Sequence, residues 1–139
     1  MTHDEMAARL EISEVLARHC RGVDRMDVDL LKSVYHEDST DDHTIFKGSG
    51  WDFAEFIVKT CRQLGGVSHH NITNSLIELR SSDLAHADTY YVTHHAFADP
   101  DTGQKMLLLA LGRYLDRLER RAGVWRIGSL ANENQSMTS

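Results

Sequence analysis

Residues 67–133, VSHHNITNSLIELRSSDLAHADTYYVTHHAFADPDTGQKMLLLALGRYLDRLERRAGVWRIGSLANE, decide the fold of this chain. They divide into four long stretches, 67–79, 84–98, 105–121 and 124–133. The short segments between them, SSD, DPDTG and AG, have the composition of turns. We therefore predict four long strands joined by short turns in a strongly curved, antiparallel sheet.

Residues 105–121 allow a second interpretation. Their Met, Leu, Ala and Arg residues also favour a helix, and the spacing of the apolar residues is ambiguous. The flanking segments DPDTG and RAGVW are typical of hairpin turns. These turns favour a strand.

The first half of the chain has helical patterns instead. Residues 4–23 predict a helix that Asp4 could cap, with a buried apolar stripe formed by Met6, Leu10, Ile12, Val15, Leu16, Cys20 and Val23. A second helix should begin at Asp27 as its N-cap, and a third should cover residues 50–64 and end at Gly65-Gly66. Between the second and third, the polar run 36–43 (HEDSTDDH) is expected to be a solvated acidic loop, followed by a short strand at 44–48.

Composition limits the classes of protein to which the chain could belong. With 139 residues, 41% hydrophobic residues and one proline, residues 1–139 fit a single domain with its own core. Fifteen Lys and Arg against 21 Asp and Glu give a formal charge of -6, which argues against nucleic-acid binding. There is no apolar run of the roughly 20 residues that a membrane span requires. We expect a cytoplasmic protein with no membrane partner.

Three strings resemble one known family: residues 19–43, 68–79 and 112–127, which read HCRGVDRMDVDLLKSVYHEDSTDDH, SHHNITNSLIEL and GRYLDRLERRAGVWRI. They are similar to the SnoaL-like branch of the nuclear-transport-factor-2-like superfamily, and the resemblance covers essentially the whole chain. It implies a cone-shaped α+β barrel in which three N-terminal helices pack in a strongly curved, mainly antiparallel sheet. It also implies a homo-oligomer, either a dimer or a trimer.

The resemblance assigns two residues a catalytic role. The family includes dehydratases and dehydrochlorinases that act as lyases without a cofactor or metal, through an Asp after the first helix and a His on the first long strand. Asp24 in RGVDRMD and His70 in SHHNITN match these positions. A carboxylate beside an imidazole selects the tautomer of the ring and stabilises the imidazolium that forms when the other ring nitrogen takes a proton.

Two further positions of the dehydrochlorinase members do not match. A Lys of the first helix corresponds to His19, and an Arg that follows the fourth long strand's GVW segment corresponds to Leu130. The chain therefore lacks both cations that would stabilise a departing chloride. This difference argues against loss of halide and favours loss of an oxygen-bearing group.

Further candidates for substrate binding lie on the second and third long strands. Alternation sends Tyr91, Thr93 and His95 to one face, which we expect to line the cavity. His19 and Tyr114 are candidates for binding a polar group of the substrate, and Leu130 is a further substrate-binding candidate. The adjacent pairs His69-His70 and His94-His95 suggest metal binding, but neighbours on a strand point to opposite faces, so we expect no metal site.

These observations predict a cofactor-independent lyase for a small hydroxylated molecule, aromatic or alicyclic. His70 would remove a proton, Asp24 would orient it, and Tyr91 or His95 would assist the leaving group. Loss of water is the preferred reaction, and retro-aldol loss of a small carbonyl fragment would use the same base. An isomerase or polyketide cyclase of the same fold is the nearest enzymatic alternative. A small-molecule-binding protein or accessory subunit without catalysis is the alternative from another class.

Overall fold

Within residues 1–138 the chain forms three helices along one side of a curved, six-stranded sheet. The computed structural model describes residues 1–138. Its elements are α1 (His3–Asp24), α2 (Val28–Ser33), β1 (Tyr35–Asp42), β2 (Lys47–Gly48), α3 (Gly50–Leu64), β3 (Val67–Leu79), β4 (Leu84–Ala98), β5 (Lys105–Arg121) and β6 (Val124–Thr138). The strand order is β2-β1-β6-β5-β4-β3. The predicted α+β fold is confirmed.

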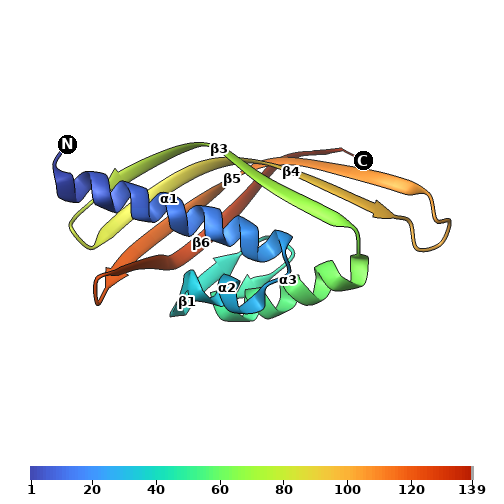
Figure 1. The fold of residues 1–139 in the computed structure, drawn as a ribbon, viewed down its shortest axis with the longest axis horizontal. Coiled ribbons are helices and arrows are strands. Elements are labelled where there is room, and N and C mark those ends of the chain that lie inside the picture. Colours follow the sequence, from blue (N-terminus) through green and yellow to red (C-terminus); the bar gives the residue numbers. More distant parts are fainter. Residues whose placement is uncertain (139) are drawn as a thin grey trace.

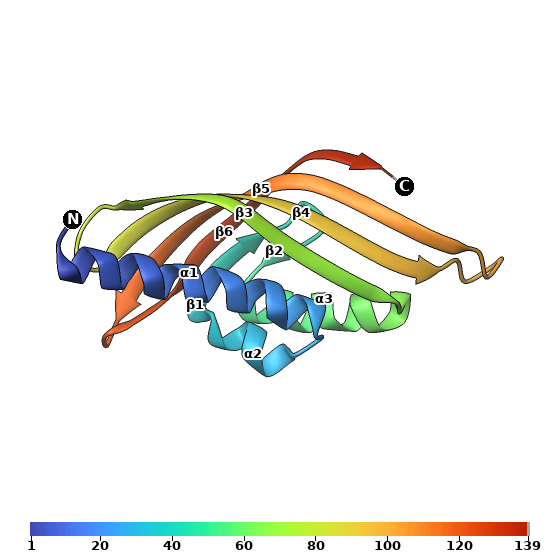
Figure 2. The same ribbon diagram turned by 45° about the horizontal axis from the view of Figure 1, so that its top comes forward.

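The four long strands arch over the helices (Figure 1). β3, β4, β5 and β6 pair antiparallel in sequence order, and residues 105–121 are a strand rather than a helix. Turning the molecule shows α1 and α3 on the concave side of the arch (Figure 2). Among the described residues the sheet stays open, with β2 and β3 as its two edges.

Short polar residues begin each helix by accepting backbone hydrogen bonds. Asp27 caps α2 as predicted, and Ser49 caps α3. The N-cap of the first helix is Thr2, two residues before the predicted cap Asp4, because Thr2 and Glu5 form a capping box. No helix within residues 1–138 is long and apolar enough to cross a bilayer.

The core lies between α1 and the sheet. Ile12, Leu118 and Ile127 are fully buried there. Two members of the predicted stripe, Met6 and Leu10, are instead 41% and 70% exposed. Leu10 is two residues from Ile12, or about 200° around the helix, so it faces away from the sheet.

The polar run 36–43 was predicted to be a loop, and that prediction is wrong. Residues 35–42 form β1, which pairs parallel with β6. Ser39, Asp41 and His43 are buried, because alternation turns them toward the interior. The strand predicted at 44–48 shrinks to Lys47–Gly48.

Candidate active site

A cavity of about 260 Å³ lies on the concave side of the sheet, between α1, α3 and the four long strands. Apolar side chains from several of these elements form part of its wall, among them Val23, Phe53, Ile57 and Leu108. Polar side chains also line it: His19, His43, Ser68, His70, Tyr91, Thr93, His95, Tyr114, Asn132 and Asn134. A mainly apolar pocket with a few converging polar groups is the usual form of a small-molecule site.

Asp24 and His70 meet at one end of this cavity. Asp24 is the last residue of α1, and His70 lies near the start of β3. The Asp24 carboxylate accepts hydrogen bonds from the His70 ring Nδ1 at 2.5 Å, the His70 backbone N–H at 2.9 Å and the Ser68 hydroxyl at 3.1 Å. These contacts select the Nδ1–H tautomer of His70 and leave its Nε2 lone pair free, on a ring that lines the cavity.

The Asp24 carboxylate is partly protected from water. The side chains of His70 and Asp24 are 15% and 16% exposed. Burial alone would raise the pKa of Asp24, but the hydrogen bonds from His70 and Ser68 outweigh it and hold the pKa below its ordinary value. Asp24 is therefore an ionised partner for the imidazole. A surface groove of about 910 Å³ between α1 and the start of β3 also reaches both residues and connects them with solvent.

The predicted set on β4 lies on the cavity wall. Tyr91, Thr93 and His95 all line the cavity, whereas His94 points away and is exposed. Tyr91 donates its hydroxyl proton to Asn132 at 2.8 Å, and His95 Nε2 bonds the Gly65 carbonyl at 2.9 Å. The Thr93 hydroxyl is buried and has no hydrogen-bond partner among the described residues. It is available to a bound ligand.

His19 and Tyr114 also line the cavity, but Leu130 does not. Leu130 is buried beside Leu16 in a small internal space of about 10 Å³. On β6 the side chains of Leu130, Asn132 and Asn134 all point inward. Residues of α1 pack against Leu130 and exclude it from the cavity. Asn132 and Asn134, which sequence reasoning missed, therefore form the part of the wall predicted for Leu130.

Sequence reasoning also missed His43. The acidic residues around it indicated a solvated loop, yet its ring is buried and lines the cavity. Its Nδ1 bonds the buried Asp41 carboxylate, which also accepts a hydrogen bond from Tyr35 at 2.6 Å. Alternation of Ser39, Asp41 and His43 in the sequence was the signal that could have indicated a strand.

The cysteines have no nucleophilic character in this environment. Burial, with Asp24 and Asp116 nearby, raises the pKa of the Cys20 thiol to about 12. Burial and Asp24 likewise raise the pKa of Cys61, which lines the cavity. Both residues are free thiols. The cavity is therefore better suited to acid–base catalysis by its histidines than to nucleophilic catalysis by a cysteine.

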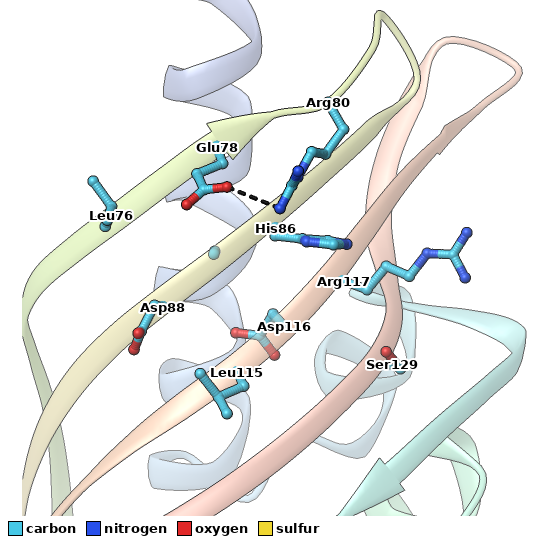
Figure 3. Close-up of a pocket in the computed structure, with 10 residues that line it drawn as sticks. Leu76, Glu78, Arg80, His86, Asp88, Leu115, Asp116, Arg117 and Ser129 are labelled. Carbon is cyan, nitrogen blue, oxygen red and sulfur yellow. Dashed lines mark ion pairs between the residues drawn. The ribbon is translucent and has the colours of Figure 1, made fainter.

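A second concavity, of about 410 Å³, lies on the opposite face of the sheet. Figure 3 shows Leu76, Glu78, Arg80 and His86 in front of the strands, with a helix behind the sheet, whereas Asp116 is buried. Glu78 pairs with Arg80 at 3.1 Å, and Asp88 pairs with Arg113 at 3.1 Å. Glu78 and Arg80 pair with each other in solvent, so this concavity is a weaker candidate for an active site than the cavity on the concave side.

Comparison with known proteins agrees with this architecture. A family model described as a SnoaL-like domain matches residues 4–131. A Novosphingobium aromaticivorans protein provisionally named a scytalone dehydratase is 16% identical, with a TM-score of 0.87, 99% of this chain and 91% of that chain covered. No curated protein sequence matches the chain.

Two further solved structures share the fold. The hexachlorocyclohexane dehydrochlorinase of Novosphingobium barchaimii is 23% identical, with a TM-score of 0.84, and the match covers 97% of this chain and 91% of that chain. A protein from Kribbella flavida is 20% identical, with a TM-score of 0.86 and coverage of 97% and 95%. At these identities the likeness extends to the fold alone.

Proposed function

The chain belongs to the SnoaL-like domain family, and from this premise we propose that it is a cofactor-independent lyase for a small hydroxylated molecule, alicyclic or aromatic. The observation that carries the proposal is the hydrogen bond between His70 Nδ1 and Asp24 at the cavity wall. The proteins with this fold include a dehydrochlorinase and one provisionally named a dehydratase. Fold likeness alone does not select a reaction, so the proposal depends on the site.

In this reaction His70 is the base. Its Nε2 takes a proton from a carbon that a neighbouring carbonyl acidifies, while Asp24 holds the ring and stabilises the imidazolium. The electrons of the C–H bond form a double bond, and the C–O bond to the departing hydroxyl breaks. Retro-aldol cleavage would begin with the same base on a hydroxyl proton. Positioned proton transfer contributes about 10²- to 10⁴-fold in rate.

Tyr91 and His95 are better suited to binding than to proton donation. Burial raises the pKa of Tyr91, so its phenol stays protonated, but the proton is already shared with Asn132. His95 uses its Nε2 in the contact with Gly65. Together with the unpartnered Thr93 hydroxyl, these groups would hold polar atoms of the substrate.

The test is a screen of hydroxylated alicyclic and aromatic compounds for loss of water. We expect His70→Ala and Asp24→Asn to lower kcat by about 10²- to 10⁴-fold, because each removes part of the base. His69→Ala is the matched control, since His69 is the exposed neighbour of His70 on β3. Equal turnover by wild type and both variants would refute the role of the pair. Saturable binding without turnover would favour a binding protein instead.

We also propose that the protein is a homo-oligomer formed through the outer face of the sheet. Five large apolar side chains lie in solvent along β3, β4 and β5: Leu76, Tyr90, Leu107, Leu111 and Leu115. Exposed apolar side chains on adjacent strands favour association. The ion pairs Glu78–Arg80 and Asp88–Arg113 carry both signs of charge, so a second copy is a complementary partner for this face.

A further inference from the structure

The cavity contains a second carboxylate–imidazole pair, formed by Asp41 and His43. Asp41 lies at the inner end of β1, and His43 follows β1 in the turn toward β2. Asp41 is 2% exposed and His43 9%. The Nδ1 atom of His43 bonds the Asp41 carboxylate, as the Nδ1 atom of His70 bonds Asp24. The two pairs come from different elements, and the rings of both histidines line the same cavity.

The donor and the acceptor of each hydrogen bond around Asp41 can be assigned. The Tyr35 hydroxyl donates to Asp41 at 2.6 Å, so its oxygen accepts the bond from His19 Nε2 at 2.9 Å. His43 donates from Nδ1 to the other carboxylate oxygen. Asp41 thus accepts from two donors, which is the arrangement of an ionised carboxylate. This contact fixes the Nδ1–H tautomer and the direction of the His43 ring.

The ring of His43 has a fixed orientation. It stacks on Phe53 with ring centroids 4.0 Å apart, and it lies parallel to His19 at 6.1 Å. With Nδ1 bound to Asp41, the Nε2 atom is the position from which the ring can exchange a proton with a ligand. With Phe53 against the ring and Nδ1 held by Asp41, Nε2 is the ring nitrogen that remains for a ligand.

The other groups near His43 do not compete for this role. On α1, burial and then the charges of His43 and His70 hold the pKa of His19 well below its ordinary value, so His19 stays neutral. On β5, burial and then Asp41 raise the pKa of Asp116 well above its ordinary value, and burial raises the pKa of Tyr114. Burial raises the pKa of Tyr35 on β1 as well.

We propose that His43, held by Asp41, is the general acid that protonates the oxygen leaving the substrate while His70 removes the proton from carbon. This inference rests on the proposed lyase function and adds a second catalytic residue to it. Asp41 acts through His43 and is a positioning residue. The Tyr91 hydroxyl and the His95 Nε2 already hydrogen bond to Asn132 and to the Gly65 carbonyl, so we assign the proton for the leaving group to His43.

The atoms balance for a simple alicyclic substrate, 3-hydroxycyclohexanone. His70 Nε2 takes one proton from C2, and the C–H electron pair becomes the C2–C3 double bond. The C3–O bond breaks, its electron pair stays on oxygen, and the oxygen takes the Nε2 proton of imidazolium His43. The products are cyclohexenone and water. His70 ends protonated and His43 neutral, and exchange with solvent restores both.

The experiment compares two leaving groups on one carbon skeleton. 3-Hydroxycyclohexanone must expel hydroxide unless an acid protonates it, whereas 3-(4-nitrophenoxy)cyclohexanone expels a weakly basic phenolate without such help. We expect His43→Phe to lower kcat/KM for the hydroxy compound by about 10²- to 10⁴-fold and to leave the nitrophenoxy compound within a few-fold of wild type. His70→Ala should lose both reactions. His43→Gln, which keeps a donor near Asp41, should behave like His43→Phe.

The dependence of kcat/KM on pH distinguishes a catalytic role of His43 from a structural one. A reaction that needs a general acid should lose kcat/KM at alkaline pH, so this alkaline limb should be present for the hydroxy compound with the wild type and missing for the nitrophenoxy compound and for His43→Phe. Asp41→Asn should lower kcat/KM for the hydroxy compound alone, because the His43 ring loses the carboxylate that holds its Nδ1. His94→Phe, on the outer face, is the control that should change neither reaction.

Each outcome decides between the two proposals. Equal losses on both compounds in His43→Phe and His43→Gln would refute the general acid and indicate a structural role. Unchanged turnover of the hydroxy compound in these variants would also refute it, and would leave the His70 base intact. Turnover of neither compound by wild type would contradict the proposed base itself.

Discussion

Three aspartates in the interior have different electrostatic environments, and the difference follows from their partners. Asp24 accepts three hydrogen bonds, and Asp41 accepts two. Asp116 on β5 is 4% exposed, and neither of its carboxylate oxygens has a hydrogen-bond partner among the described residues. Burial and then the charge of Asp41 raise its pKa well above the ordinary value. Asp116 is therefore the one of these three aspartates whose surroundings favour the neutral, protonated form.

This environment predicts how stability changes with pH. In the window that begins near pH 4, the folded state keeps the Asp116 proton while the unfolded chain releases it, so stability falls as pH rises. The slope is at most about 1.4 kcal/mol per pH unit and ends at the folded pKa. We expect Asp116→Asn to remove this slope and to be more stable than wild type at neutral pH. Urea unfolding between pH 5 and 8 measures it.

The control for this prediction is Asp29→Asn, because Asp29 is exposed in the first turn of α2. It should keep the wild-type dependence on pH. If Asp116→Asn also keeps that dependence, Asp116 is ionised in the folded protein.

At the scale of secondary-structure elements, close approach between strands determines the position of Tyr91. Gly112 on β5 is paired with Tyr91 on β4 and with Asn134 on β6, where the register shifts. A Cβ atom on Gly112 would lie 2.4 Å from the Tyr91 hydroxyl and 2.6 Å from the Glu133 carbonyl oxygen. The backbone carbonyl cannot move away as a side-chain tip could.

We predict that Gly112→Ala destabilises the protein by about 1 to 3 kcal/mol through overpacking. It should also displace the Tyr91 ring and weaken ligand binding in the cavity. Gly123→Ala is the comparison: its φ of 78° imposes strain, but no atom lies within 4 Å of the added methyl group. Thermal unfolding and ligand titration together distinguish the two. Binding that is equally affected in both variants would contradict this prediction.

For the whole molecule, the open curved sheet has two faces with different surroundings. The concave face, covered by α1 and α3, encloses the cavity (Figure 2). The convex face is uncovered and carries exposed leucines beside paired charges (Figure 3). The cavity and the exposed apolar side chains therefore lie on opposite faces of one sheet.

If copies associate through the convex face, a charge placed there should separate them. Leu111 is 40% exposed and lies on the central strand β5. We expect Leu111→Lys to yield monomers in sedimentation velocity, because the lysine charges would lose their hydration in the interface. Leu10→Lys, at a 70% exposed position on α1, should keep the wild-type mass. A monomeric wild-type protein would contradict the proposed oligomer.

Inward-facing side chains were predicted correctly on β4, in the second half of the chain, and missed on β1, in the first half. In β4 the alternation of Tyr91, Thr93 and His95 was sufficient to assign them to one face, because side-chain direction on a strand depends only on parity. In β1 the same alternation of Ser39, Asp41 and His43 was hidden by polar residues that resemble a solvated loop. They are buried because each finds a partner supplied by the fold: Tyr35 and His43 for Asp41, and the Gly50 backbone N–H for Ser39.

The sequence by itself therefore determined the three helices, the four long strands and their order, and the contact between Asp24 and His70 that the family resemblance implied. Only the tertiary structure decided how deep each inward residue lies. Leu130 and Asn132 share one face of β6, yet α1 packs over the first and leaves the second in the cavity. The same packing brings Asp41 and His43 beside His19. Direction is a local property of the backbone, whereas depth depends on which distant segment occupies the adjacent space.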